Sequence, residues 1–228
     1  FLLSFILTSI GLYVLWRFMR EPEPPTIRPR VSMRERLRDF PELLGDRDYR
    51  NFLIAQLLVV AARISTPFCI LYAADKMDMD GTAIGMLTLA FLGADTLSNL
   101  IWGHLGDRQG YRLTFIVSIL IWMVALVLLI VAQGAVPIYL AFFGIGASMS
   151  GYMMSSSTII LEFGSRDDLP MRLAMSTTAE TSMATIGPLA GGAIAWGFGY
   201  LPLFFISIAF LLAALLITAF MVREPRTR

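Results

Sequence analysis

Three ionisable residues lie within long apolar stretches of the sequence: Arg63, Asp95 and Glu180. A charge near the middle of a bilayer costs about 2.5–3.5 kcal/mol on insertion scales, so such residues normally face a bundle interior or a wet cavity. A neighbouring arginine favours the ionised form of a carboxylate, whereas a dry cavity favours the neutral acid. We therefore interpret Arg63 as a substrate-binding or switch cation and Asp95 or Glu180 as a protonatable coupling group. A permanent ion pair between Arg63 and Asp95 is the structural alternative.

Other polar residues share helical faces with these three. Gln56 precedes Arg63 by two turns, and Asn99 follows Asp95 by one turn. Tyr152 lies in a stretch rich in Ser and Gly, where its hydroxyl could contact a substrate while the glycines serve helix packing. The candidate substrate-binding or ion-coupling residues are thus Arg63, Asp95, Asn99, Glu180, Gln56 and Tyr152.

The composition predicts that these residues sit in membrane-spanning helices. Apolar residues make up 57% of the 228 residues and charged residues only 15%, whereas an ordinary globular chain is about a quarter charged. A helix that crosses a bilayer needs roughly 20 mostly apolar residues. Seven stretches qualify: 1–18, 52–74, 83–103, 113–132, 137–161, 173–198 and 202–222.

The charged residues indicate the orientation and exclude several classes of protein. If the spans alternate sides, every Lys and Arg except Arg63 and Lys76 falls on one side, which is therefore cytoplasmic. This side holds a long linker, residues 19–51, and the C-terminal tail, residues 223–228.

The net charge of +1 gives no reason to expect a nucleic-acid partner. One cysteine, Cys69, and one histidine, His104, leave no disulfide, metal cluster or catalytic constellation, so we expect no enzyme and no cofactor.

The chain shows signs of an internal repeat and of a missing beginning. The first and last spans are both followed by Arg-Glu-Pro, at residues 20–22 and 223–225. The chain opens on Phe1, inside an apolar run, and its basic residues follow that run instead of preceding it as in a signal peptide. We expect the chain to be a fragment that lacks an N-terminal half.

The most specific motif follows the third span, where residues 103–112 read Gly-His-Leu-Gly-Asp-Arg-Gln-Gly-Tyr-Arg. This segment resembles the signature loop of the major facilitator superfamily, Gly-x-Leu-Ala/Gly-Asp-Arg/Lys-x-Gly-Arg-Arg/Lys, with Tyr111 in place of one basic residue. Members of this family have twelve helices in two six-helix halves. The resemblance therefore implies an all-α membrane protein whose seven transmembrane helices are the second six-helix repeat, residues 52–222, preceded by helix six at residues 1–18.

The resemblance also implies a function, a location and an inner gate. Family members are secondary transporters that work by alternating access, so we expect a small solute as substrate, proton coupling, and the plasma membrane as the location. The bilayer and the missing N-terminal half would be the other partners. Glu162 and Arg172 match the acidic residue and arginine of the loop before helix eleven. The expected cytoplasmic gate comprises Gly103, Gly106, Asp107, Arg108, Gly110, Arg112, Glu162 and Arg172.

Two further segments have alternative interpretations. Residues 187–192 resemble the Gly-Pro-x-x-Gly-Gly stretch that antiporters of the family carry on helix five, but here the stretch falls on helix eleven. Small-residue packing explains it equally well, so Gly187, Pro188, Gly191 and Gly192 are expected to serve helix packing. Residues 33–44 of the linker have an amphipathic pattern and are expected to lie along the inner membrane surface, with a binding site for a regulatory partner as the alternative.

Two other classes of membrane protein compete with a transporter. A seven-span receptor matches the number of spans, although a receptor does not need the 103–112 motif. A transporter-like sensor would keep the motif but show no flux. For a transporter, we expect Arg63→Ala to abolish transport while leaving expression intact.

Overall fold

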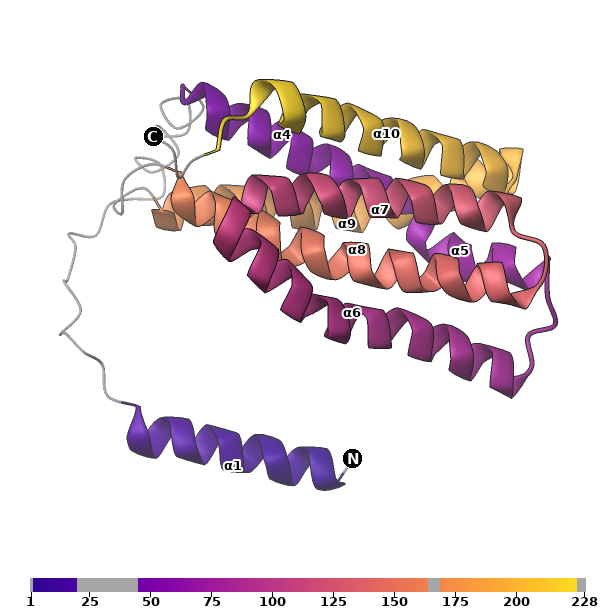
Figure 1. Ribbon diagram of the computed structural model, residues 1–228, viewed down its shortest axis with the longest axis horizontal. Helices are drawn as coiled ribbons and strands as arrows, with labels where there is room; N and C mark the ends of the chain where they lie inside the picture. Colours follow the sequence, from indigo (N-terminus) through magenta and orange to yellow (C-terminus); the bar gives the residue numbers. More distant parts are fainter. Residues whose placement is uncertain (1, 20–44, 164–168, 225–228) are drawn as a thin grey trace. The chain divides into compact units, whose positions relative to one another are not determined.

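The computed structural model describes residues 2–19, 45–163 and 169–224 as an entirely helical protein without strands in these ranges (Figure 1). The chain divides into two units, residues 1–37 and 38–228. In the first unit, α1 spans Leu2–Phe18 and exposes apolar side chains on all sides. The amphipathic segment predicted at 33–44 lies outside the described residues.

The second unit is a bundle of long helices that coincide with the six remaining predicted spans. Their bounds differ from the predicted bounds by a few residues. The elements are α4 (Arg47–Ala62), η1 (Arg63–Ser65), α5 (Thr66–Ala74), α6 (Gly81–Gln109), α7 (Tyr111–Val131), α8 (Ala135–Glu162), α9 (Leu169–Phe198) and α10 (Tyr200–Met221).

The first helix of this bundle differs from its prediction at both of its ends. α4 begins at Arg47, before the predicted start at residue 52, because the Asp46 carboxylate caps it by accepting from the backbone N–H of Asp48 and Tyr49 at 3.1 and 3.3 Å. The predicted continuous span is also interrupted by the 3-10 turn η1. Pro67 has no amide hydrogen to donate to the Arg63 carbonyl, so the N–H of Thr66 bonds to it instead.

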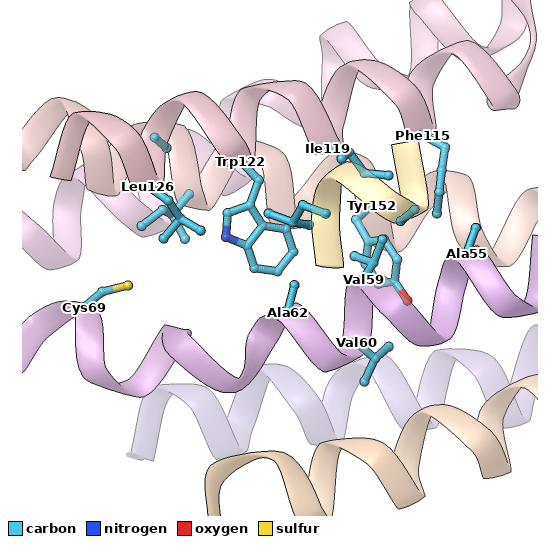
Figure 2. Packing of buried hydrophobic residues seen from close by; sticks show 14 of the residues in the cluster. Ala55, Val59, Val60, Ala62, Cys69, Phe115, Ile119, Trp122, Leu126 and Tyr152 are labelled. Carbon is cyan, nitrogen blue, oxygen red and sulfur yellow. The ribbon is translucent and has the colours of Figure 1, made fainter. Parts of the chain in front are cut away.

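The core of the bundle is built around α8, which packs most extensively on α7 and α6. Trp122 and Phe115 of α7 are buried, and so is the Tyr152 ring of α8, whose centroid lies 5.7 Å from that of Phe115. Figure 2 shows these side chains meeting Val59 and Ala62 of α4. The core therefore fixes the rotation of α4 and α8, which present polar residues next to it.

Small residues set the distance between α6 and α8. A Cβ built on Gly146 would collide with the backbone carbonyl of Phe91, so only glycine fits at this crossing. The Trp102 indole donates to the Ala147 carbonyl at 2.8 Å beside it. The two backbones are therefore in direct contact, as is common where helices associate in membranes.

We predict that Gly146→Ala destabilises the bundle by about 1–3 kcal/mol, because an added methyl group must push two backbones apart. The matched control is Gly93→Ala in α6, where a Cβ meets nothing within 4 Å and alanine has the higher helix propensity. The measurement is the thermal unfolding midpoint of each purified variant in detergent. A Gly146→Ala midpoint equal to that of Gly93→Ala would contradict the close approach.

The surface of the bundle fits a lipid environment. Five helical stretches are long and apolar enough to cross a membrane: Arg47–Ala74, Gly81–Gln109, Tyr111–Val131, Ala135–Glu162 and Tyr200–Met221. Large apolar side chains are exposed along them, including Leu100 at 80% and Phe220 at 81%, which a soluble protein rarely tolerates in such numbers. α9 is 30 residues long and therefore about 45 Å in length, although its Ser, Thr and charged residues make it less apolar. The prediction of an all-α membrane protein is confirmed.

Candidate functional site

Four polar side chains from three helices meet inside the bundle. The Gln56 side chain of α4 donates from Nε2 to Glu180 Oε1 at 2.8 Å. The Tyr152 hydroxyl of α8 donates to the same carboxylate oxygen. Ser176 of α9 donates to Gln56 Oε1 at 2.8 Å. The result is a continuous hydrogen-bonded chain, Ser176–Gln56–Glu180–Tyr152, which we call the polar cluster.

Burial and packing hold the cluster in place. Gln56 and Ser176 are each 2% exposed and Tyr152 is fully buried, whereas Glu180 is only half-buried. Gln56 uses both ends of its amide, and this fixes the direction in which its N–H groups point. A carboxylate that accepts two hydrogen bonds on one oxygen and keeps partial access to its surroundings is able to exchange a proton or contact a polar ligand.

The structure brings together three of the predicted substrate or coupling residues: Gln56, Tyr152 and Glu180. Ser176 was not predicted. It precedes Glu180 by one helical turn, so its shared face with Glu180 is the sequence signal that could have identified it. No single-helix pattern, however, indicates that Gln56 lies opposite this face.

Arg63 stands at the break between α4 and α5 and is half-buried. Its charge lies within electrostatic range of the Tyr152 hydroxyl. Within the described residues its guanidinium makes no hydrogen bond or ion pair. The predicted structural pair between Arg63 and Asp95 is therefore not present among these residues.

Asp95 and Asn99 lie on α6, and within the described residues neither side chain hydrogen-bonds to a member of the polar cluster. Asp95 is half-buried, and Asn99 is exposed and donates to the Asp95 backbone carbonyl at 2.8 Å. Exposed threonines continue this polar character on α6 and α9; they are Thr88, Thr96, Thr177, Thr178, Thr181 and Thr185. α6 and α9 thus each expose polar residues that a lipid-facing helix would not carry.

The 103–112 segment is helical over most of its length and is not a loop as predicted. α6 continues through Asp107 and Arg108, and Gly110 alone joins it to α7, with a φ of 92° that favours glycine. Tyr111, which replaces a basic residue of the motif, donates from its hydroxyl to the Asp107 carboxylate at 3.1 Å. The Tyr111 ring also covers Gly106, where a side chain would collide with it.

Arg112 and Asn51 bind the end of α10. Arg112 donates to the backbone carbonyls of Thr218 and Ala219 at 3.1 and 2.6 Å, and Asn51 donates to that of Met221 at 3.0 Å. These carbonyls are among the last four of the helix, which have no partner within it. The Glu224 carboxylate lies against Gly110. The start of α4, the start of α7 and the end of α10 are thus bound to one another.

Arg172 contacts the start of α4 and not the 103–112 segment. Its guanidinium forms an ion pair with Asp46 at 3.5 Å and lies 4.5 Å from the centre of the Tyr49 ring. Tyr49 donates in turn to the Arg172 carbonyl at 3.1 Å. Glu162, the other residue predicted before helix eleven, ends α8. Arg108 is exposed, and Gly103 has open space where a side chain would extend.

The glycine-rich part of α9 contacts its neighbours at one main position. Gly191 is buried against η1, where a Cβ would come within 2.8 Å of the Ile64 carbonyl oxygen. A Cβ on Gly187 would meet nothing within 4 Å, and one on Gly192 would only reach the Phe68 ring at 4.0 Å. Pro188 is exposed within the helix. The close approach therefore joins α9 to the turn that carries Arg63.

Comparison with known proteins places this architecture in a family. The family model described as Major Facilitator Superfamily matches residues 52–228. "Multidrug resistance protein MdtG" of Yersinia enterocolitica is 33% identical over 123 residues, covering 54% of this chain and 30% of that protein. The protein of the same name from Escherichia coli strain 55989 is 28% identical over 185 residues, covering 77% of this chain and 45% of that protein. The chain thus spans less than half the length of these curated relatives. Because the family model covers most of its residues, the chain belongs to the major facilitator superfamily.

Proposed function

We propose that this chain forms part of a secondary active transporter that moves a small solute by alternating access and couples this movement to protons through Glu180. The observation that carries the proposal is the polar cluster. It places a half-buried carboxylate of α9 where α4 and α8 each supply one hydrogen-bond donor to it. Intramembrane carboxylates of this kind mark ion pathways and proton relays.

The cluster offers a simple coupling step. Hydrogen bonds to a carboxylate favour its charged form, and their loss in a dry environment favours the protonated form. Gln56, Tyr152 and Glu180 belong to three different helices, so a shift of α9 relative to α4 and α8 changes the number of donors around Glu180. Proton uptake would accompany the separation of these helices and proton release their return.

The remaining candidate residues would line the transport cavity. Arg63 lies within electrostatic range of the cluster and makes no ion pair among the described residues, which leaves its charge available to a substrate or to a carboxylate in another conformation. Asp95 and Asn99 belong to the polar residues of α6. Binding sites in such transporters lie near the bilayer midplane, between two repeats. The N-terminal half of the protein would supply the opposite wall.

One end of the bundle, which we call the arginine-rich end, carries Arg47, Arg108, Arg112, Arg172 and Arg223. This end would form the inner gate on the cytoplasmic side of the plasma membrane. The Arg172–Asp46 ion pair and the Arg112 contacts with α10 join helices there. Such contacts can form in one conformation and break in another.

The relatives carry the name multidrug resistance protein, so we propose toxic, drug-like solutes as substrates.

The test is flux in reconstituted vesicles that contain the full protein and a pH gradient. We expect fluorescent drug-like solutes to accumulate with the gradient and to equilibrate when a protonophore removes it. Protein-free vesicles carry the same gradient and control for passive partitioning. Binding without gradient-driven accumulation would contradict transport and would favour the sensor. Accumulation that is insensitive to the protonophore would contradict proton coupling alone.

A further inference from the structure

A cavity of about 420 Å³ lies between the start of α4 and the end of α10, at the arginine-rich end of the bundle. Its lining comes from both helices and comprises Arg47, Asp48, Asn51, Phe220, Met221 and Arg223. Neither the polar cluster nor the contacts proposed for the inner gate account for it. We propose that this cavity binds the headgroup of an anionic phospholipid.

The charges of the lining favour an anion. Arg47 and Arg223 are exposed, and in the part of the chain that the structure describes neither guanidinium has a hydrogen-bond or ion-pair partner. Asp48 also lines the cavity, is only 8% exposed and has an interaction of its own. Two arginines against one aspartate leave a net positive charge. Guanidinium groups bind phosphate through paired hydrogen bonds.

The helix ends add to this preference. α4 begins at Arg47, so the positive end of its dipole lies at the cavity. α10 ends there, and its dipole alone would repel an anion. Arg112 and Asn51, however, already donate to the last carbonyls of α10. The cavity therefore receives the attraction of one helix end while the repulsion of the other is largely compensated.

The apolar part of the lining selects a lipid over a free phosphate ion. Phe220 is 81% exposed and Met221 is 47% exposed, both in the last turn of a helix apolar enough to cross a membrane. They line the same cavity as the two arginines. A headgroup phosphate at the arginines would therefore place its acyl chains along Phe220, at the level where the bilayer begins. Basic pockets between transmembrane helices are known to bind anionic headgroups in this way.

The site is already formed without a ligand. Asn51, 5% exposed, donates to the Met221 carbonyl and holds the two helix ends together under the cavity. A lipid that bridges Arg47 and Arg223 would therefore strengthen a junction that exists already. Binding to a preformed site needs little ordering of the protein.

The test is lipid titration of the full chain, delipidated in detergent and analysed by native mass spectrometry. The probes are phosphatidylglycerol and phosphatidylcholine with identical acyl chains. The double variant Arg47→Gln/Arg223→Gln removes both cationic groups, and Arg50→Gln removes one exposed charge from the same turn of α4 outside the cavity lining. Gel filtration and a thermal midpoint establish that each variant is folded.

We expect phosphatidylglycerol to bind one-to-one to the wild type and roughly 30-fold more weakly to the double variant, since each arginine near an anionic lipid surface strengthens binding roughly fivefold. Arg50→Gln should change the affinity by less than about threefold, and phosphatidylcholine should bind all proteins alike. If Arg50→Gln lost as much affinity for phosphatidylglycerol as the double variant, the effect would come from general surface charge. That result would overturn the proposed site. Displacement of phosphatidylglycerol by inorganic phosphate or glycerol 3-phosphate alone would overturn the assignment to a lipid.

Discussion

Replacement of Glu180 by glutamine is expected to abolish proton-driven accumulation while leaving substrate exchange in place. Both donors to Glu180 point at the same oxygen, Oε1, so the single carbonyl oxygen of a glutamine can accept from Gln56 and Tyr152 together. The variant therefore keeps the geometry and loses only the charge and the ability to carry a proton. Because the glutamine amide cannot take up or release a proton, we expect gradient-driven accumulation to fall to the level of protein-free vesicles.

The experiment compares two kinds of flux in the same vesicles. Accumulation against a pH gradient requires a proton carrier, whereas exchange of labelled for unlabelled solute at equal pH requires only the binding site. Asp78→Asn is the matched control, because Asp78 is an exposed carboxylate between α5 and α6. Full accumulation in Glu180→Gln would exclude Glu180 as the coupling group. Loss of both fluxes in Glu180→Gln, with the protein folded, would instead assign Glu180 to substrate binding.

The helices themselves could be predicted because a membrane span needs a long apolar run, and six such runs became α4–α5 and α6 to α10. The break at η1 also has a sequence signal, since Thr66-Pro67 removes one backbone hydrogen bond. We predicted one continuous span there because hydropathy does not respond to a missing donor. The 103–112 segment was expected to be a loop because it is polar and follows the apolar run, yet its residues extend α6 by about two turns.

The polar cluster could be predicted only in part. Spacing places residues on the same face of one helix, as it does for Gln56 and Arg63, but it does not define the rotation of one helix relative to another. Gln56 and Glu180 are 124 positions apart in the sequence and meet through the packing of α4 on α9. Opposite charge alone also allowed a pair between Arg63 and Asp95, in addition to the contacts that form in the polar cluster. Core residues such as Trp122 and Phe115 determine which polar residues come together.

The arginine at the helix break permits a test that separates function from structure. If Arg63 belonged to a permanent ion pair, removing it would leave an uncompensated buried charge and destabilise the protein by about 3–5 kcal/mol. In the described residues Arg63 makes no such pair and is half-buried. Its removal should therefore relieve the cost of holding a charge within a span. Stability and activity should respond to Arg63→Ala in opposite directions.

We accordingly expect Arg63→Ala to reduce accumulation of solute to the level of protein-free vesicles while its thermal midpoint stays at or above that of the wild type. Arg63→Lys keeps the charge without the planar donor geometry and should retain partial flux. Arg50→Ala removes an exposed arginine of α4 outside the proposed cavity and should leave flux unchanged. Wild-type flux in Arg63→Ala would remove Arg63 from the transport mechanism. A lowered midpoint together with lost flux would assign Arg63 a structural role, in which it maintains the turn at η1. Gly191 of α9 packs against Ile64 in that turn, so the close approach of the two segments depends on the shape of the turn.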